Sequence, residues 1–334
     1  MLSVQLASGK QFSMEGGELL LNAASKAGVL LPYSCKTGRC GACKCKVISG
    51  ITSSMQEETG LTDIEKSEGW ILSCVRTSDS NLILEVEDLG AIALPPAKML
   101  PCRISALDKL APDVIRVLLR LPPTAEFRFI PGQYIDIIGP GGMRRSYSLA
   151  NASFSNKVLE LHIRAVPGGA MSDYWFHQAR IDDLLRLNGP LGTFFLRDVA
   201  DADLIFLATG TGIAPVKAIL ESICDLSFDQ QPKSVTVVWG GRTRDDLYID
   251  TSKMPGDHLF IPVLSRAGSG WSGSVGYVQD VILSTKPDLG DAAVYACGSA
   301  EMIRDAKEVL VQAGLPQQRF YSDAFVCSAT NTSN

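Results

Sequence analysis

Three closely spaced cysteines constrain this chain more than any other feature. Cys35, Cys40 and Cys43 stand at C-x4-C-x2-C spacing, and Cys74 follows after thirty intervening residues. Four thiolates at this spacing are the ligand pattern of a [2Fe–2S] cluster, in which one loop supplies the first three ligands. The spacing therefore predicts such a cluster, with these four cysteines as its metal ligands.

The residues around the cysteines bear on the alternatives. A zinc site would favour two C-x2-C pairs, and Cys74 has no partner cysteine two or three residues away. Gly38 and Gly41 would let the loop turn with its N–H groups toward the sulfurs. Cys45 alternates with Val47 on the strand expected next, so we expect a core residue there and not a fifth ligand.

Length and composition place limits on the remainder. A chain of 334 residues is too long for one core and predicts two or three domains. The net charge of −5 argues against a nucleic-acid partner. No apolar run approaches the roughly 20 residues of a membrane span, and the first residues alternate like a strand, unlike a signal peptide. Nine cysteines, four of them assigned to iron, fit a reducing compartment, so we expect a cytoplasmic protein with no membrane partner.

The first ninety residues show a hairpin at Ser8-Gly9, a helix over 20–27 and a closing strand over 82–86. With the cysteine loop, residues 1–90 resemble a plant-type ferredoxin of the β-grasp kind. The loop is basic, with Lys36, Arg39, Lys44 and Lys46, and the next segment is acidic, with Glu57, Glu58, Asp63, Glu65 and Glu68. Two interpretations of these charges stay open: solubility, or a face that meets an electron partner.

A proline-containing spacer, residues 91–101, precedes a region of short strands that predicts a small antiparallel barrel over 102–198. Three motifs in it carry chemistry: Arg144 to Asn151 (RRSYSLAN), His162-Ile163-Arg164, and Gly168 to Ser172 (GGAMS), where glycines open a helix. In this order they resemble the flavin domain of the ferredoxin–NADP reductase family.

That resemblance implies FAD and gives each position a role. Arg145 would hold the pyrophosphate, Tyr147 would pack on the isoalloxazine, and Ser148 would bond near flavin N5 as a catalytic residue. Gly169 and Ser172 would complete the phosphate cradle. The implied FAD site also includes His162, Ile163 and Arg164. Arg144 is expected to be a solvated neighbour.

The last region, 199–334, predicts a parallel α/β domain that binds NAD(P). Leu204 to Ala208 form a continuous apolar run, typical of a strand buried on both faces. The motif Gly210-Thr211-Gly212-Ile213-Ala214-Pro215 and a helix follow, which is the context of a dinucleotide site. Proline replaces the third glycine of the usual fingerprint, as in the reductase family.

Other positions follow from the same resemblance. Cys297 would border the hydride path as a catalytic residue, and this role does not exclude a packing role. The implied dinucleotide and C-terminal positions are Gly210, Thr211, Gly212, Pro215, Arg242, Arg266, Cys297, Gly298, Met302 and Phe325. The stretch from Leu247 to Leu259 has room for only about two helical turns, so the adenosine end is less well defined than the nicotinamide end.

The three resemblances together imply a multidomain α+β and α/β reductase. A nicotinamide donates two electrons as hydride and a cluster accepts one, so FAD must stand between them. The electrons would pass from NAD(P)H, with NADH favoured by Asp245 and Asp246, to a partner protein. Residues 121–125, 189–195 and 321–325 resemble reductases that serve a CDP-6-deoxyhexulose 3-dehydrase, and reductases of aromatic-ring or multicomponent oxygenases share the layout.

Three functional hypotheses therefore stay open. Delivery to a dehydrase and delivery to an oxygenase are not separated by the sequence. A redox-sensing or regulatory flavoprotein without significant turnover is the third. We expect the chain to act as a monomer.

Overall fold

The computed structural model describes residues 1–90, 92–152 and 157–326. Two compact units divide the chain: residues 1–93 with 323–334, and residues 94–322. Residue 91 of the predicted spacer and residues 327–334 of the predicted nucleotide domain lie outside the described residues.

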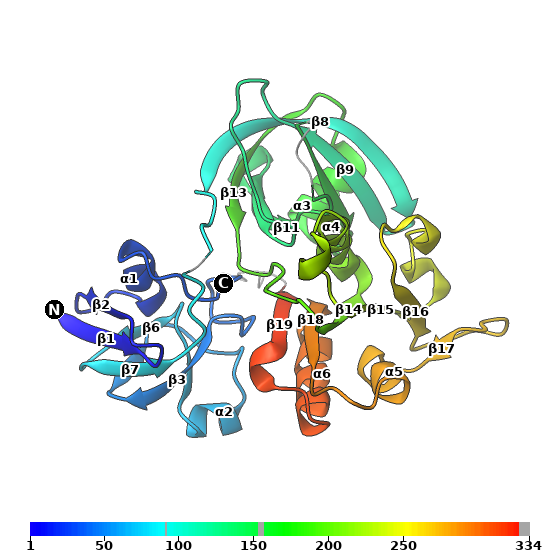
Figure 1. The fold of residues 1–334 in the computed structure, drawn as a ribbon. Coiled ribbons are helices and arrows are strands. Elements are labelled where there is room, and N and C mark those ends of the chain that lie inside the picture. Colours follow the sequence, from blue (N-terminus) through cyan, green and yellow to red (C-terminus); the bar gives the residue numbers. More distant parts are fainter. Residues whose placement is uncertain (91, 153–156, 327–334) are drawn as a thin grey trace. The chain divides into compact units, whose positions relative to one another are not determined.

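A five-stranded sheet forms the first unit, in the order β2-β1-β7-β3-β5 (Figure 1). Its strands are β1 (Leu2–Leu6), β2 (Gln11–Met14), β3 (Lys44–Ser49), β5 (Trp70–Leu72) and β7 (Leu82–Glu85). A small second sheet pairs β4 (Thr52–Ser54) with β6 (Arg76–Ser78). The predicted hairpin is confirmed, since β1 runs antiparallel to β2 and parallel to β7.

The core of this unit lies between its sheet and the helix α1 (Leu20–Lys26). Alternate residues of β1 and β2 point inward, and Leu20 from the helix meets them. The helix ends before Gly28, whose φ of +74° is readily accessible to glycine. Cys45 is fully buried in the same core, which confirms that its position on β3 is a packing position. A short helix, α2 (Asp63–Ser67), begins with a capping box between Thr62 and Glu65.

The second unit contains an antiparallel sheet in the order β11-β10-β13-β8-β9-β12. Its strands are β8 (Lys98–Ala111), β9 (Val114–Arg120), β10 (Tyr134–Ile138), β11 (Arg144–Ser148), β12 (Val158–Arg164) and β13 (Leu184–Leu191). A bridge between Leu149 and Leu161 joins the two ends of the sheet. This closure confirms the predicted barrel.

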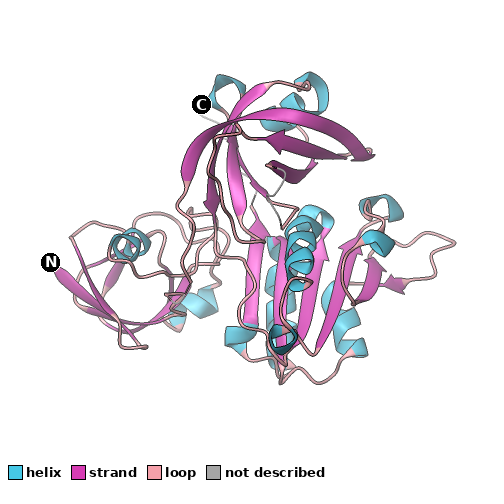
Figure 2. Cartoon of the chain, turned by 45° about the horizontal axis from the view of Figure 1, so that its top comes forward, coloured by secondary structure: helices cyan, strands magenta, loops and turns pink. Residues whose placement is uncertain are grey.

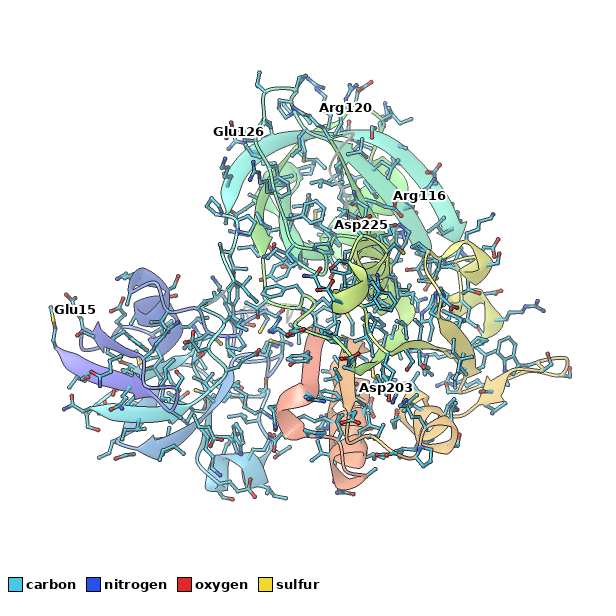
Figure 3. The ribbon with its side chains drawn as sticks, in the orientation of Figure 1. Glu15, Arg116, Arg120, Glu126, Asp203 and Asp225 are labelled. Atoms are coloured by element: carbon cyan, nitrogen blue, oxygen red, sulfur yellow. The ribbon has the colours of Figure 1, made fainter. Side chains whose placement is uncertain are left out.

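The barrel begins earlier than the predicted spacer allowed. Residues 98–101 were expected in the spacer, but they pair with 186–189 of β13 and form the start of β8. This earlier start depends on pairing with β13, a strand distant in the sequence, and no local sequence pattern indicates it. On β9, Arg116 pairs with Asp108 and Arg120 pairs with Asp182. Figure 3 labels both arginines.

A six-stranded sheet follows in the order β17-β16-β15-β14-β18-β19, with helices on both of its faces (Figure 2). Its strands are β14 (Asp203–Thr209), β15 (Ser234–Gly241), β16 (Leu259–Leu264), β17 (Ser274–Val275), β18 (Ala292–Ser299) and β19 (Phe320–Phe325). The helices are α4 (Ile213–Ile223), α5 (Val278–Thr285) and α6 (Ala300–Gln312). β14 pairs in parallel with β15 and β18 and is buried almost throughout, as its apolar run predicts.

The connection between β15 and β16 is short. Two 3-10 turns, Arg244–Asp246 and Thr251–Lys253, occupy it in place of a full helix. None of the helices in the described ranges is both long and apolar enough to cross a membrane.

Candidate electron-transfer site

The four predicted cluster ligands form two pairs in the first unit. The hydrogen bond between the Cys35 and Cys40 side chains lowers the pKa of Cys35, and the corresponding bond to Cys43 lowers the pKa of Cys74. The N–H of Thr37 also points at the Cys35 sulfur, 3.4 Å away. Donors aimed at sulfur favour the thiolate form, which is the form that binds metal.

Two pairs are the arrangement that two irons require. Each iron of a [2Fe–2S] centre completes its four sulfur ligands with two thiolates, because two bridging sulfides supply the others. The site therefore fits a two-iron cluster, and the assignment of the individual ligands stays a prediction.

Glycines shape the cysteine loop as expected. Gly38 has a φ of +74°, and a Cβ there would lie 2.6 Å from the carbonyl oxygen of Glu57. Gly41 has a φ of +77°, and its Cβ would lie 3.2 Å from the carbonyl oxygen of Gly60. Segment 57–60 thus packs directly on the loop, and a side chain at Gly38 would push the two apart.

Most of the loop's positive charge is engaged inside the unit. Three of the four predicted basic residues have a partner: Lys44 pairs with Glu65, Lys36 lies 4.3 Å from the Tyr33 ring centroid, and Lys46 lies 5.7 Å from that of Trp70. Glu57 and Glu68 are exposed on the neighbouring segment.

In the second unit, the neighbouring residues Arg144 and Arg145 lie on opposite sides of strand β11. The Nε of Arg144 donates to Asp136 at 2.8 Å, and Asp136 also accepts from Ser146 at 2.5 Å. The Arg144 side chain is half exposed, as expected of a solvated neighbour, and it also forms an ion pair with Asp136. Arg145 alternates onto the other side with Tyr147, is exposed, and forms no ion pair with any described residue. Its guanidinium can meet an anionic ligand.

The Tyr147 ring is fixed at its polar end. Its hydroxyl accepts a hydrogen bond from the Trp175 indole at 3.0 Å, and the two rings meet edge to face. Burial raises the pKa of Tyr147 to about 12, so the phenol stays protonated at neutral pH. Ser148 follows at the end of β11 and is buried. Tyr147 and Ser148 are consecutive at the end of β11, as their two predicted flavin contacts require.

The glycine turn leads into the helix α3 (Ala170–Asp173), which continues as a π-helical turn to Gln178. Gly168 has a φ of +70°. The Ser172 hydroxyl accepts a hydrogen bond from the N–H of Val166 at 2.9 Å, so this side chain closes the turn. Its own proton can still be donated to a ligand, and the predicted phosphate contact stays a prediction.

Arg164 brings positive charge to the dinucleotide turn. Its Nη1 pairs with Asp246 at 2.8 Å, and its Nε lies 3.4 Å from Asp113. Nη2 is buried without a hydrogen bond to any described residue. A Cβ added at Gly210 would lie 3.5 Å from Nη1. A guanidinium nitrogen left unsatisfied beside a glycine turn is chemically suited to a phosphate oxygen.

The dinucleotide turn packs tightly on the end of β18. A Cβ at Gly212 would lie 2.2 Å from the carbonyl oxygen of Cys297. Gly298 has a φ of +140°, and its Cβ would lie 2.2 Å from the Thr209 hydroxyl oxygen. Cys297 itself is fully buried at the carboxyl end of β18, beside the turn. The two strand ends can approach this closely only because both glycines lack a side chain.

The remaining predicted positions lie on this sheet, on its helices or just beyond its strand ends. Pro215 is buried in the first turn of α4, Met302 is nearly buried on α6, and Phe325 ends β19. Arg242 and Arg266 are exposed at the ends of β15 and β16, where the N–H of Arg266 donates to the carbonyl oxygen of Arg242 at 2.9 Å.

Comparison with known proteins identifies the family. Residues 5–77 match the 2Fe-2S iron-sulfur cluster binding domain, 101–196 the oxidoreductase FAD-binding domain, and 206–308 the oxidoreductase NAD-binding domain. A CDP-6-deoxy-L-threo-D-glycero-4-hexulose-3-dehydrase reductase of Yersinia pestis is 39% identical over 98% of this chain and 99% of its own. The chain belongs to the iron–sulfur flavoprotein reductases.

Two further proteins that resemble this reductase are named for other electron-transfer systems. The reductase component 1 of terephthalate 1,2-dioxygenase from Comamonas is 30% identical over 96% of both chains. The crystal structure of the Amycolatopsis cytochrome P450 reductase GcoB superposes with a TM-score of 0.73 at 29% identity, covering 97% of this chain and 99% of that one. The three matched domains confirm the predicted cofactors, FAD, a [2Fe–2S] cluster and NAD(P)H. The hypothesis of a sensor without turnover gains no support.

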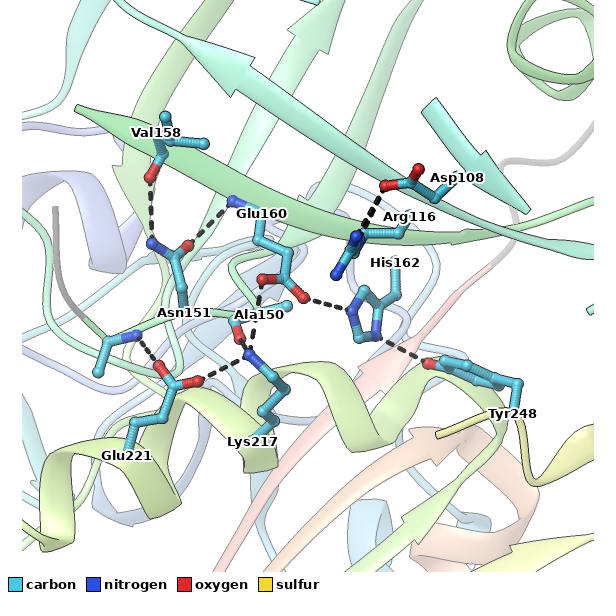
Figure 4. Close-up of polar contacts among 11 residues, drawn as sticks. Asp108, Arg116, Ala150, Asn151, Val158, Glu160, His162, Lys217, Glu221 and Tyr248 are labelled. Carbon is cyan, nitrogen blue, oxygen red and sulfur yellow. Dashed lines mark hydrogen bonds and ion pairs between the residues drawn. The ribbon is translucent and has the colours of Figure 1, made fainter. Parts of the chain in front are cut away.

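The reductase also contains a polar network that the sequence did not reveal (Figure 4). Glu160 accepts from the Nε2 of His162 at 2.8 Å, and the Nδ1 of His162 lies 3.1 Å from the Tyr248 hydroxyl. Lys217 on α4 lies 3.6 Å from Glu160 and donates to Glu221 at 2.7 Å. The network joins β12 of the barrel to α4 and to the segment after β15.

The charges in this network are consistent with a neutral histidine. Burial has the largest effect on the pKa of His162 and lowers it, and the charges of Lys217 and Arg116 lower it further. This pKa therefore lies below its ordinary value although Glu160 raises it. Burial raises the pKa of Glu160, but His162 and Lys217 outweigh it and leave this pKa below its ordinary value. Because a carboxylate can only accept, Nε2 carries the proton and Nδ1 accepts from Tyr248. Both ring nitrogens are thus used by protein, and the predicted cofactor contact of His162 would have to come from its backbone.

Proposed function

We propose that this reductase carries electrons from NADH through FAD and a [2Fe–2S] cluster to a dehydrase that acts on a CDP-linked 6-deoxyhexulose. The support is the similarity to the Yersinia reductase, 39% identity over nearly the whole of both chains, against 30% for the dioxygenase reductase. Residues 121–125, 189–195 and 321–325 resemble the same group. The cofactors supply a hydride acceptor that can release single electrons.

The chain's own residues would hold and orient these groups. Arg145 supplies the exposed guanidinium for the FAD pyrophosphate, while Asp136 holds its neighbour Arg144 away from that task. Tyr147, fixed by Trp175, presents its ring to the flavin. Arg164 and the turn at Gly210 offer positive charge and open backbone to the dinucleotide. Cys35, Cys40, Cys43 and Cys74 supply the thiolates.

NADH remains the proposed donor. Of the two carboxylates that favoured it, Asp245 and Asp246, the second makes other contacts within the protein. Asp246 pairs with Arg164 and accepts from the N–H of Arg242, so it faces inward. Asp245 is exposed and can meet an adenosine ribose. Arg242 and Arg266 stand nearby and would favour a 2′-phosphate. The proposal rests on Asp245 prevailing over these cations.

Delivery to an oxygenase component is the second candidate, favoured by the Comamonas relative and by the likeness to the cytochrome P450 reductase. Oxidation of NADH by the purified reductase, followed at 340 nm, discriminates between the two. We expect the rate to rise when a purified CDP-6-deoxyhexulose 3-dehydrase and its sugar substrate are added. Acceleration by a purified ring-dioxygenase oxygenase component with its aromatic substrate, and none by the dehydrase, would reverse the assignment.

A further inference from the structure

Glu58 is a buried carboxylate in the segment between the third and fourth cluster cysteines. Its side chain is 4% exposed. Oε1 accepts from the backbone N–H of Leu72 at 2.8 Å, and Oε2 accepts from the Nε and Nη2 of Arg76 at 3.0 and 2.5 Å. The Nη1 of Arg76 donates to the carbonyl and hydroxyl oxygens of Thr52, each at 3.2 Å. The pair is therefore fully hydrogen-bonded.

These contacts lie on both sides of Cys74, the fourth predicted ligand, in the sequence. Leu72 is the last residue of β5 and Arg76 is the first of β6, so they stand two residues before and two residues after Cys74. Cys74 is 3% exposed in the turn between them. A single carboxylate thus holds both strand ends that present this cysteine.

The other side of the Glu58 segment contacts the loop that carries the first three ligands. The N–H of Gly60 donates to the carbonyl oxygen of Gly38 at 3.0 Å. The carbonyl oxygen of Glu57 lies only 2.6 Å from the position that a Cβ at Gly38 would take. Glu58 therefore joins the two parts of the chain that must converge on one cluster.

The pair also balances charge close to the cysteines. The Arg76 side chain is only 20% exposed, so water screens neither charge well. A cluster gains one negative charge on reduction. An unpaired cation nearby would favour the reduced form, and an unpaired anion would oppose it.

We propose that Glu58 is a positioning residue for Cys74, and that its pairing with Arg76 keeps the net charge beside the cluster near zero and so sets the cluster's reduction potential. Glu58 acts through Leu72 and Arg76, on either side of the ligand. The inference rests on the proposed cluster, whose EPR signal in the unaltered reductase tests that premise separately.

The experiment is a reductive titration of the full-length reductase, monitored by EPR of the cluster, with iron and sulfide analysis of every sample. Glu58→Gln leaves Arg76 unpaired, and we expect the ratio of reduced to oxidised cluster at the wild-type midpoint to rise roughly tenfold. Arg76→Gln leaves Glu58 unpaired, and the ratio should fall by a similar factor. The double variant should return close to wild type.

Charge-conserving variants separate the two parts of the proposal. Arg76→Lys should keep the midpoint close to wild type. Glu58→Asp keeps the charge but withdraws the carboxylate from the Leu72 N–H, so iron content should fall while the remaining cluster titrates near the wild-type midpoint. Lys10→Gln, which breaks the Lys10–Asp88 pair of the same unit, is the control and should change neither quantity.

The outcomes are decisive in each case. Shifts of the same sign for Glu58→Gln and Arg76→Gln, or no shift with full iron content, would overturn the electrostatic role. If these two variants cannot be purified with iron, Glu58→Asp and the double variant carry the test. Wild-type iron content in Glu58→Asp would then overturn the proposal. So would a double variant whose ratio of reduced to oxidised cluster, measured at the wild-type midpoint, differs from that of the wild type by roughly tenfold.

Discussion

The Nδ1 atom of His162 lies 3.1 Å from the Tyr248 hydroxyl, and this contact ties the flavin barrel to the nucleotide-binding sheet. His162 belongs to β12, whereas Tyr248 follows the strand β15. The Tyr248 ring also meets Trp239 edge to face, with centroids 5.3 Å apart, and the Trp239 indole donates to the carbonyl oxygen of Gly210 at 3.0 Å. A chain of contacts thus leads from the barrel to the dinucleotide turn.

Removal of the Tyr248 hydroxyl tests that connection. Tyr248→Phe keeps the ring but leaves the buried Nδ1 of His162 without a donor, so we expect a loss of about 1–3 kcal/mol in unfolding free energy. Urea denaturation followed by tryptophan fluorescence measures it. Tyr277→Phe is the matched control, because Tyr277 is 62% exposed. Equal stability of the two variants would show that the hydrogen bond contributes nothing.

The pH dependence of stability follows from the buried histidine. The pKa of His162 is lowered in the folded protein by burial, so below pH 6.5 the unfolded chain binds the additional proton. Its contribution to stability is therefore complete above about pH 6.5 and is lost as the pH falls toward the folded pKa. The difference in unfolding free energy between wild type and His162→Asn, measured from pH 5 to 8, isolates this contribution. A difference that is independent of pH would contradict it.

The cluster ligands are tested by single substitutions. Changing Cys35, Cys40, Cys43 or Cys74 to serine should abolish or markedly alter the visible iron–sulfur spectrum, because a hard alkoxide replaces a soft thiolate. Cys45→Ala should leave the spectrum intact, since this residue faces the core of β3. A normal spectrum in Cys74→Ser would refute the ligand assignment.

The two neighbouring arginines should differ in their effect on FAD. Arg145→Ala removes a charge-assisted contact worth about 1.5–3 kcal/mol, so the dissociation constant of FAD should rise roughly 10- to 150-fold. Arg144→Ala breaks the pair with Asp136 and should lower stability while most of the FAD is retained. Fluorescence titration of the apoprotein with FAD measures both. Comparable FAD affinities in the two variants would place the pyrophosphate elsewhere.

The choice of nicotinamide is measured by kcat/KM for NADH and NADPH with ferricyanide, which bypasses the protein acceptor. We expect a preference for NADH, which Asp245→Asn should weaken, because a carboxylate bonds a ribose hydroxyl and repels a 2′-phosphate. Arg319→Gln, a change on a turn before β19, serves as a control. A clear preference for NADPH in the wild type would show that Arg242 and Arg266 outweigh Asp245.

Local patterns were sufficient to predict most elements of this protein. The alternation in β1 and β2, the apolar run of β14 and the spacing of the cysteines each depend on residues close together in the chain. Such patterns specify which side of an element is buried and which turns need glycine. The helix expected after the Gly210 turn is present and begins at Ile213. The barrel and the parallel sheet also followed from strand spacing.

Contacts between segments that are distant in the sequence decided the features that local patterns did not predict. Arg144 acquires its role from Asp136 on the neighbouring strand, and residues 98–101 join β8 because β13 pairs with them. Glu160, Lys217 and Tyr248 carry no motif, so only their convergence on His162 shows their importance. Sequence alone determined the order of the three cofactor-binding regions and the residue types they need. Tertiary structure decided which charges are paired, because a buried charge is stabilised by whichever partner folding brings within a few ångströms.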